Sequence, residues 1–166
     1  MQNNLFRPDW QTESIISKVS LNDMCNRDLK GLLIDVDHTL LTRDESIVHE
    51  SVREWIESAK SYFKLHLISN NPSYKRVNSV AKQLNVGFSH KALKPRKSSL
   101  LEMVKLFKLK NHEVAMIGDR IFTDILAGNR AGMYTILVKG IGTNGSLQCN
   151  NLNQHIESII AKLLGA

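Results

Sequence analysis

The sequence predicts an α/β fold in which one parallel sheet carries helices on both faces. Two observations predict it. Short apolar runs alternate with amphipathic stretches along the 166 residues, and each run is bounded by Gly, Asn, Asp or Pro. This alternation is typical of parallel strands joined by crossover helices. The expected strands are Leu32–Val36, Leu65–Ser69, Val86–Ser89, Val114–Gly118 and Tyr134–Val138.

The stretches between these strands have apolar residues at helical spacing. Val52, Trp55, Ile56 and Ala59 form one such face, three and four residues apart. The expected helices are Glu50–Tyr62, Ser73–Leu84, Lys97–Phe107 and Phe122–Ala131, followed by a last helix at Leu152–Leu164.

The domain organisation follows from the even composition. No internal repeat or composition break divides the chain, and the connections are short. We therefore predict a single domain over 1–166 without a substantial cap. Residues 1–29 form an N-terminal arm or helix, 30–138 a motif-bearing core, and 139–166 a loop and C-terminal helix.

The bulk properties indicate a soluble protein with an anionic partner. Hydrophobic residues make up 42% of the chain and charged residues 23%, which is ordinary for a globular domain. The net charge of +6 favours a phosphorylated substrate, an acidic lipid surface or nucleic acid. The first residues lack a secretory signal, and no apolar run approaches the roughly 20 residues that cross a bilayer. We expect a cytoplasmic or organelle-matrix location, with no secretion.

Polar side chains gather at the carboxyl ends of the predicted strands. Asp35, Asp37, Ser69 and Asp119 all lie at such ends, where open α/β sheets bind ligands. Asp35 and Asp37 are two positions apart and share a face if the chain stays extended. Two close carboxylates are costly unless a proton or cation relieves them, and Mg²⁺ suits such an oxygen site.

Three further segments supply phosphate-binding chemistry. Ser69-Asn70-Asn71 offers a hydroxyl and two amides after the second strand. Lys94-Pro95 precedes a helix, and a lysine there can neutralise a phosphoryl group in the transition state. The segment GDRIFTD at 118–124 ends the fourth strand in one acid and places a second at the next helix.

In order and spacing, DVDHT, SNN, KP and GDRIFTD resemble the four-motif signature of haloacid dehalogenase (HAD) phosphatases. The pattern with GDRIFTDILAGNRAGMYTILV and LKGLLIDVDHTLL is similar to the capless YqeG-type subfamily, which includes phosphatidylglycerophosphate phosphatases. The resemblance implies a HAD-like (Rossmannoid) fold, with Asp35 as nucleophile and Asp37 as general acid/base. It implies phosphate binding by Thr39, Ser69, Asn70 and Lys94, Mg²⁺ binding by Asp35, Asp37 and Asp119, and a supporting acid at Asp124.

Several alternatives stay open at this point. Lys91 competes with Lys94 as the phosphate lysine, although KP matches the subfamily. His38 stands where the subfamily often has Asn or Glu, and we expect it to tune activity. Arg120 and Arg130 could reach an anionic substrate or pair with surface acids. GxGxxG at 140–145 lacks the helix start of a dinucleotide site and is interpreted as a loop. The histidines show no zinc-ligand spacing.

The resemblance also implies a substrate. We expect an Mg²⁺-dependent phosphatase that converts phosphatidylglycerophosphate to phosphatidylglycerol, held peripherally on an anionic membrane by Lys91–Lys110 and the arm Leu5–Trp10. The acid at position 37 favours a phosphatase over a dehalogenase or a transport ATPase. One rival is a phosphatase acting on a soluble, protein or nucleic-acid phosphate. The other is a non-catalytic RNA-binding module; we expect no nucleic-acid partner.

Overall fold

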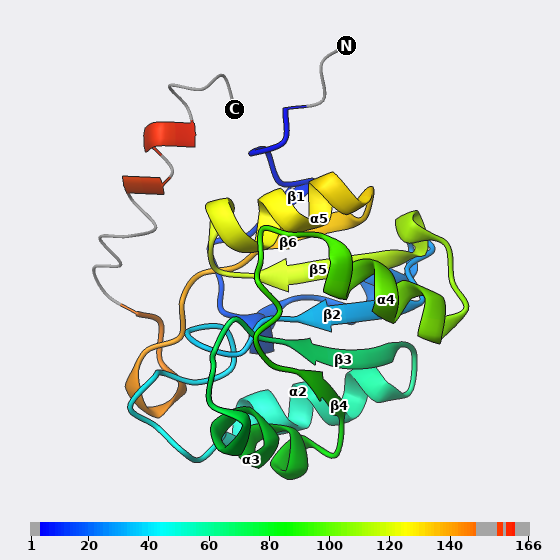
Figure 1. Cartoon of the computed structure of the whole chain (residues 1–166). Coiled ribbons are helices and arrows are strands. Elements are labelled where there is room, and N and C mark those ends of the chain that lie inside the picture. Colours follow the sequence, from blue (N-terminus) through cyan, green and yellow to red (C-terminus); the bar gives the residue numbers. More distant parts are fainter. Residues whose placement is uncertain (1–3, 149–155, 158, 162–166) are drawn as a thin grey trace.

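The fold is built on a six-stranded sheet in which every neighbouring pair is parallel (Figure 1). The computed structural model describes residues 4–148, 156–157 and 159–161. The strand order is β1-β6-β5-β2-β3-β4. The strands are β1 (Trp10–Gln11), β2 (Gly31–Ile34), β3 (Lys64–Ile68), β4 (Gly87–Ser89), β5 (Val114–Gly118) and β6 (Tyr134–Leu137).

Helices cover both faces of this sheet, as Figure 1 shows. Helices α2 (Glu50–Lys60) and α3 (Tyr74–Leu84) share one apolar core with Leu32 and Ile34 of β2. Helices α4 (Ser98–Phe107) and α5 (Leu126–Ala131) share the other core with Leu33. This alternation along β2 is the two-residue period of a strand buried on both faces. The α/β fold that the sequence predicted is confirmed.

Shorter helices complete the described chain. Helix α1 (Leu21–Cys25) follows the 3₁₀ turn η1 (Ile16–Lys18), and two more 3₁₀ turns are η2 (Asn111–Glu113) and η4 (Thr143–Gly145). The segment η3 (Ile121–Ile125) is a π-helix that leads into α5, where the sequence predicted a regular helix from Phe122. No helix among the described residues is long and apolar enough to span a membrane.

The N-terminal end of the chain differs in part from the expectation. The strand β1 was not predicted, because two residues are too few to show a period. Its Trp10 pairs with Ile136 of β6, and the Arg27 guanidinium lies 5.0 Å from the centre of the Trp10 ring. The Leu5–Trp10 arm thus packs on the domain. The expected helix Leu152–Leu164 lies largely outside the described residues, which are helical at 156–157 and 159–161.

The direction of the helices separates the basic residues of Lys91–Lys110. The residues before α4 lie near the carboxyl edge of the sheet, where β4 ends. The helix then runs back, so Lys105, Lys108 and Lys110 lie toward the amino edge, close to the start of β5. Only the first part of this segment lies on the side of Asp35.

Candidate active site

The predicted nucleophile lies directly after β2, in the middle of the sheet. The backbone N–H of Asp35 donates to the carbonyl of Ile117 at 2.9 Å, which extends the pairing with β5 by one residue. Its carboxylate is almost buried, and Oδ1 lies 2.6 Å from Nζ of Lys94. The hydroxyl of Thr39 lies 3.5 Å from Oδ2. The backbone pairing of Asp35 with β5 and the ion pair with Lys94 therefore hold this carboxylate in place.

Lys94 carries a buried ammonium group with three acceptors. Its Nζ donates to Asp35 Oδ1 at 2.6 Å, to Asp124 Oδ1 at 2.6 Å and to the carbonyl of Ile68 at 2.9 Å. These three bonds use all the protons of the ammonium group. Burial disfavours the charge, but the two carboxylates outweigh it and raise the pKa of Lys94. The rival lysine, Lys91, is exposed to solvent.

Three carboxylates converge at this point. Asp35, Asp119 and Asp124 are buried, and each offers an oxygen within 4.8 Å of the others. Burial raises the pKa of Asp35 to about 7, with Lys94 opposing and Asp124 adding to the shift. Burial, together with the nearby carboxylates of Asp124 and Asp35, raises the pKa of Asp119 well above its usual value. An all-carboxylate cluster of this kind fits a hard divalent cation such as Mg²⁺.

The close approach of Asp124 to the end of β5 depends on a glycine. Asp124 accepts a hydrogen bond from the backbone N–H of Arg120 at 3.1 Å through Oδ2. A Cβ on Gly118 would lie 2.3 Å from that same oxygen, which is far inside van der Waals contact. Gly118 thus leaves the space that the Asp124 carboxylate occupies beneath the end of β5.

The structure places Asp37 apart from the carboxylate cluster. Its Oδ1 accepts from Nε of Arg76 at 3.1 Å, and its Oδ2 accepts from the amide of Asn71 at 2.9 Å. Arg76 also donates to the carbonyls of Glu45 and Thr42, both at 2.8 Å. The carboxylate cluster among the described residues brings together Asp35 and Asp119 of the predicted metal residues, with Asp124 as its third member. The predicted role of Asp37 at the metal stays a prediction.

The loops after β3 and β4 are joined through Asn70. Its side-chain oxygen accepts from the N–H of Lys94 at 2.7 Å, and its amide donates to the carbonyl of Lys94 at 2.9 Å. The buried Ser69 hydroxyl accepts from the N–H of Asn71 at 3.1 Å. Asn70 therefore positions Lys94 through its side chain, while its predicted contact with phosphate stays a prediction.

One residue that the sequence reasoning missed joins the C-terminal helix to the site. Oε1 of Glu157 accepts from Nε and Nη2 of Arg120 at 3.0 and 2.8 Å. Oε2 accepts from the N–H groups of Ile121 at 2.8 Å and Phe122 at 3.4 Å. Glu157 is buried, and its carboxylate binds the start of η3, next to Asp119, although Glu157 lies 37 residues after Arg120 in the sequence. No local signal in the sequence indicates such a pairing.

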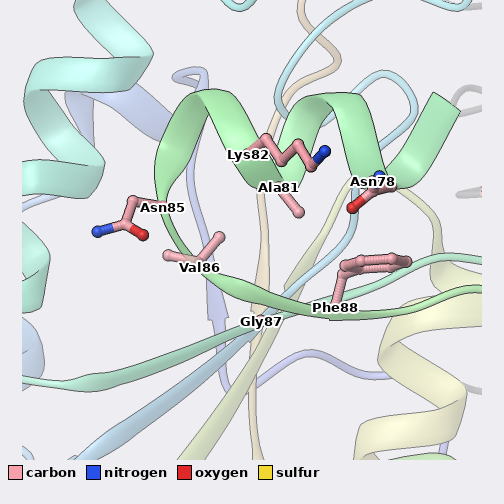
Figure 2. Close-up of a pocket in the computed structure, with 7 residues that line it drawn as sticks. All are labelled: Asn78, Ala81, Lys82, Asn85, Val86, Gly87 and Phe88. Atoms are coloured by element: carbon pink, nitrogen blue, oxygen red, sulfur yellow. The ribbon is translucent and has the colours of Figure 1, made fainter. Parts of the chain in front are cut away.

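A surface hollow of about 330 Å³ lies away from these carboxylates, between the last turns of α3 and the edge strand β4 (Figure 2). Its lining has one charged side chain and none of the predicted site residues, so it does not compete with the carboxylate cluster as an active site. The lining residues are Asn78, Ala81, Lys82, Asn85, Val86, Gly87 and Phe88.

Comparisons with known proteins agree on a family. The sequence model of the family described as "Mitochondrial PGP phosphatase" matches residues 2–142. The chain is 30% identical to "Probable phosphatase YqeG" of Bacillus subtilis, over 99% of this chain and 94% of that protein. It is 32% identical to "Phosphatidylglycerophosphate phosphatase 1, chloroplastic/mitochondrial" of Arabidopsis thaliana, over 66% of this chain but only 34% of that protein.

Solved structures share the fold at low identity. A HAD-superfamily hydrolase of Geobacter sulfurreducens matches with a TM-score of 0.55 and 15% identity, over 66% of this chain and 87% of that one. The 3-deoxy-D-manno-octulosonate 8-phosphate phosphatase of Moraxella catarrhalis, a complex with magnesium and phosphate ions, matches with a TM-score of 0.51 and 16% identity. The match covers 86% of this chain and 92% of the Moraxella protein.

Proposed function

Because the chain belongs to the family of mitochondrial PGP phosphatases, within the HAD superfamily, we propose that it hydrolyses a phosphomonoester through an aspartyl-phosphate on Asp35. The observation that carries the proposal is the Asp35 carboxylate at the carboxyl end of a central strand, 2.6 Å from the Lys94 ammonium. A carboxylate nucleophile divides the hydrolysis into two easier steps.

In the first step, a carboxylate oxygen of Asp35 attacks phosphorus and forms an O–P bond while the ester O–P bond breaks. Asp37 gives its proton to the departing oxygen. In the second step, Asp37 takes a proton from water, whose oxygen attacks the same phosphorus and frees Asp35 and inorganic phosphate. Lys94 offsets negative charge on the transferring group throughout, which is the main requirement of phosphoryl transfer.

We propose that Asp35 and Asp119 bind Mg²⁺, with Asp124 holding Lys94 beside them. The three carboxylates within 4.8 Å of one another support this assignment. When bound, the ion would neutralise charge on the phosphate oxygens. It would also favour the ionised form of Asp35, which burial disfavours by raising the pKa of that carboxyl.

Asp37 has to move during this cycle. Its two oxygens now accept from Arg76 and Asn71, so neither presents a proton to a leaving group. We propose that the side chain turns from Arg76 toward the substrate when the phosphate is bound. Arg76 is then the residue that holds Asp37 in its resting position, because its guanidinium is itself fixed by two backbone carbonyls.

For the substrate we propose phosphatidylglycerophosphate, on the support of the family and of the Arabidopsis relative. The test compares vesicles that contain this lipid with p-nitrophenyl phosphate at equal phosphate concentration, with Mg²⁺ and with EDTA. We expect the lipid to be hydrolysed far faster than the aryl phosphate, and EDTA to stop both reactions. Ready turnover of soluble esters with the vesicle lipid left intact would refute the lipid substrate and favour a soluble phosphate.

A further inference from the structure

We propose that one rim of the site is the surface that docks on an anionic bilayer. This docking lip consists of Tyr74, Lys75, Leu93, Arg96 and Lys97, in the loops and helix starts that follow β3 and β4. The inference rests on the proposed lipid substrate and adds which face of the molecule approaches it.

The two loops of the lip are joined into one unit. The N–H of Ala92 donates to the carbonyl of Ser69 at 2.9 Å, and the N–H of Lys91 donates to the carbonyl of Asn71 at 3.2 Å. The paired bonds between Asn70 and the Lys94 backbone add to these. Any surface that contacts the lip therefore lies beside Lys94 and the Asp35 carboxylate that Lys94 holds.

The lip exposes large apolar side chains where the fold does not require it. Leu93 is 57% exposed, next to Lys94, whose side chain is almost wholly buried. Leu93 has φ +57°, a conformation that disfavours a leucine and that Asn or Gly adopts more readily. Tyr74 is 55% exposed, and its ring lies 5.4 Å from those of Phe88 and His90. A leucine and a tyrosine at such positions suit the boundary between head groups and acyl chains.

The charge of the lip itself complements an anionic surface. Residues 58–101 include seven Lys and two Arg but no Asp or Glu. Lys75, Arg96 and Lys97 of this segment are exposed on the lip, while Lys94 is turned inward to the site. Each exposed cation near an anionic bilayer strengthens binding about fivefold. Nucleic acid would use the cations but would gain nothing from Leu93, so the apolar side chains favour a bilayer.

The experiment measures vesicle flotation without turnover, on vesicles of phosphatidylcholine alone and with phosphatidylglycerol added. The lip variant carries Tyr74→Ser and Leu93→Asn, since Asn fits the positive φ at that position. The matched control carries Tyr62→Ser and Leu106→Asn. Tyr62 and Leu106 are 59% and 66% exposed, but they lie at the amino edge of the sheet, at the ends of α2 and α4.

We expect wild type and control to float with the vesicles that contain phosphatidylglycerol and only weakly with phosphatidylcholine. The lip variant should bind those vesicles about tenfold more weakly, because it loses its apolar contact. Lys75→Gln with Lys97→Gln should weaken binding by about 25-fold, and Lys105→Gln with Lys108→Gln by much less.

Three results would overturn the docking lip: equal losses in lip and control variants, equal binding to both vesicle types, or lip variants that lose affinity for duplex DNA but not for vesicles. The substrate proposal is tested separately. A chain that binds vesicles through the lip but leaves phosphatidylglycerophosphate intact would refute the substrate and keep the docking lip. If the chain hydrolyses the lipid and the lip variants change neither binding nor hydrolysis, the substrate proposal is kept and the docking lip is refuted.

Discussion

Lys94→Met removes the buried charge that joins the nucleophile to its neighbours, at nearly constant side-chain length. The wild-type ammonium contacts Asp35 and Asp124 at 2.6 Å each, and its side chain is 1% exposed. Methionine fills the space but offers neither charge nor donor. Two buried carboxylates, with Asp119 close by, then face one another without a cation.

Two magnitudes follow from this geometry. Removing one partner of a buried ion pair costs about 3–5 kcal/mol of stability when the other charge remains. The carboxylates can escape part of that cost by taking up protons, because the pKa of Asp35 is already about 7. The loss of unfolding free energy without metal should therefore be larger at pH 8 than at pH 6. For catalysis, losing a preorganised charge on the transferring group should lower kcat by about 10²–10³.

The assay measures kcat and KM for p-nitrophenyl phosphate at saturating Mg²⁺, with urea unfolding at both pH values on metal-free protein. Lys91→Met is the matched control, since Lys91 is exposed and only three residues away. We expect the control to keep kcat within about twofold. If Lys94→Met keeps kcat within tenfold of wild type, or if Lys91→Met is the more damaged variant, the assignment of Lys94 is wrong.

Three more predictions concern Glu157, His66 and Gly118. Glu157→Ala should raise the Mg²⁺ concentration for half-maximal activity several-fold, because the loss of the carboxylate frees Arg120 beside Asp119. Glu157→Gln should have a smaller effect, and equal Mg²⁺ titrations of wild type and Glu157→Ala would contradict this. Burial lowers the pKa of His66 to about 4. The unfolded chain, with its pKa near 6.5, then binds a proton that the folded chain excludes, so stability is full above about pH 6.5. Because the His66 imidazole is partly exposed to solvent, this contribution to stability should fall by only about 1–2 kcal/mol toward pH 4, and His66→Gln should flatten the dependence in urea unfolding. Gly118→Ala should lower kcat more than 100-fold, because its Cβ would lie 2.3 Å from a carboxylate oxygen of Asp124 and displace it; a kcat near wild type would contradict that.

The part of the site that follows from strand order could be predicted from the sequence. Asp35, Ser69 and Asp119 each lie at or just after the carboxyl end of a strand whose apolar run is visible, and parallel strands bring such ends together. Lys94 enters the same place through the loop after β4, and the structure places its ammonium between Asp35 and Asp124. The strand predictions were right to within two residues for the same reason, since buried strands show their period directly.

Side-chain pairings across long separations could not be predicted. The sequence gives no sign that the Asp37 carboxylate accepts a hydrogen bond from Arg76, 39 residues later. Glu157 reaches Arg120 from a helix whose sequence shows only an amphipathic pattern. The π-helix at Ile121–Ile125 also escapes a search for helical spacing, because a single wide turn shifts the period by only one residue. For Asp37 and Glu157 the deciding contact is tertiary.

The central claim is that Asp35 carries the phosphoryl group, and acid quenching tests it most directly. The enzyme is mixed with substrate and Mg²⁺, quenched in acid during the first turnovers, digested and analysed by mass spectrometry. We predict one phosphoryl group on the peptide that contains Asp35, labile to hydroxylamine, and neither this adduct nor turnover in Asp35→Asn. Product formation without an adduct on Asp35, together with an Asp35→Asn variant that keeps kcat within tenfold of wild type, would contradict the account.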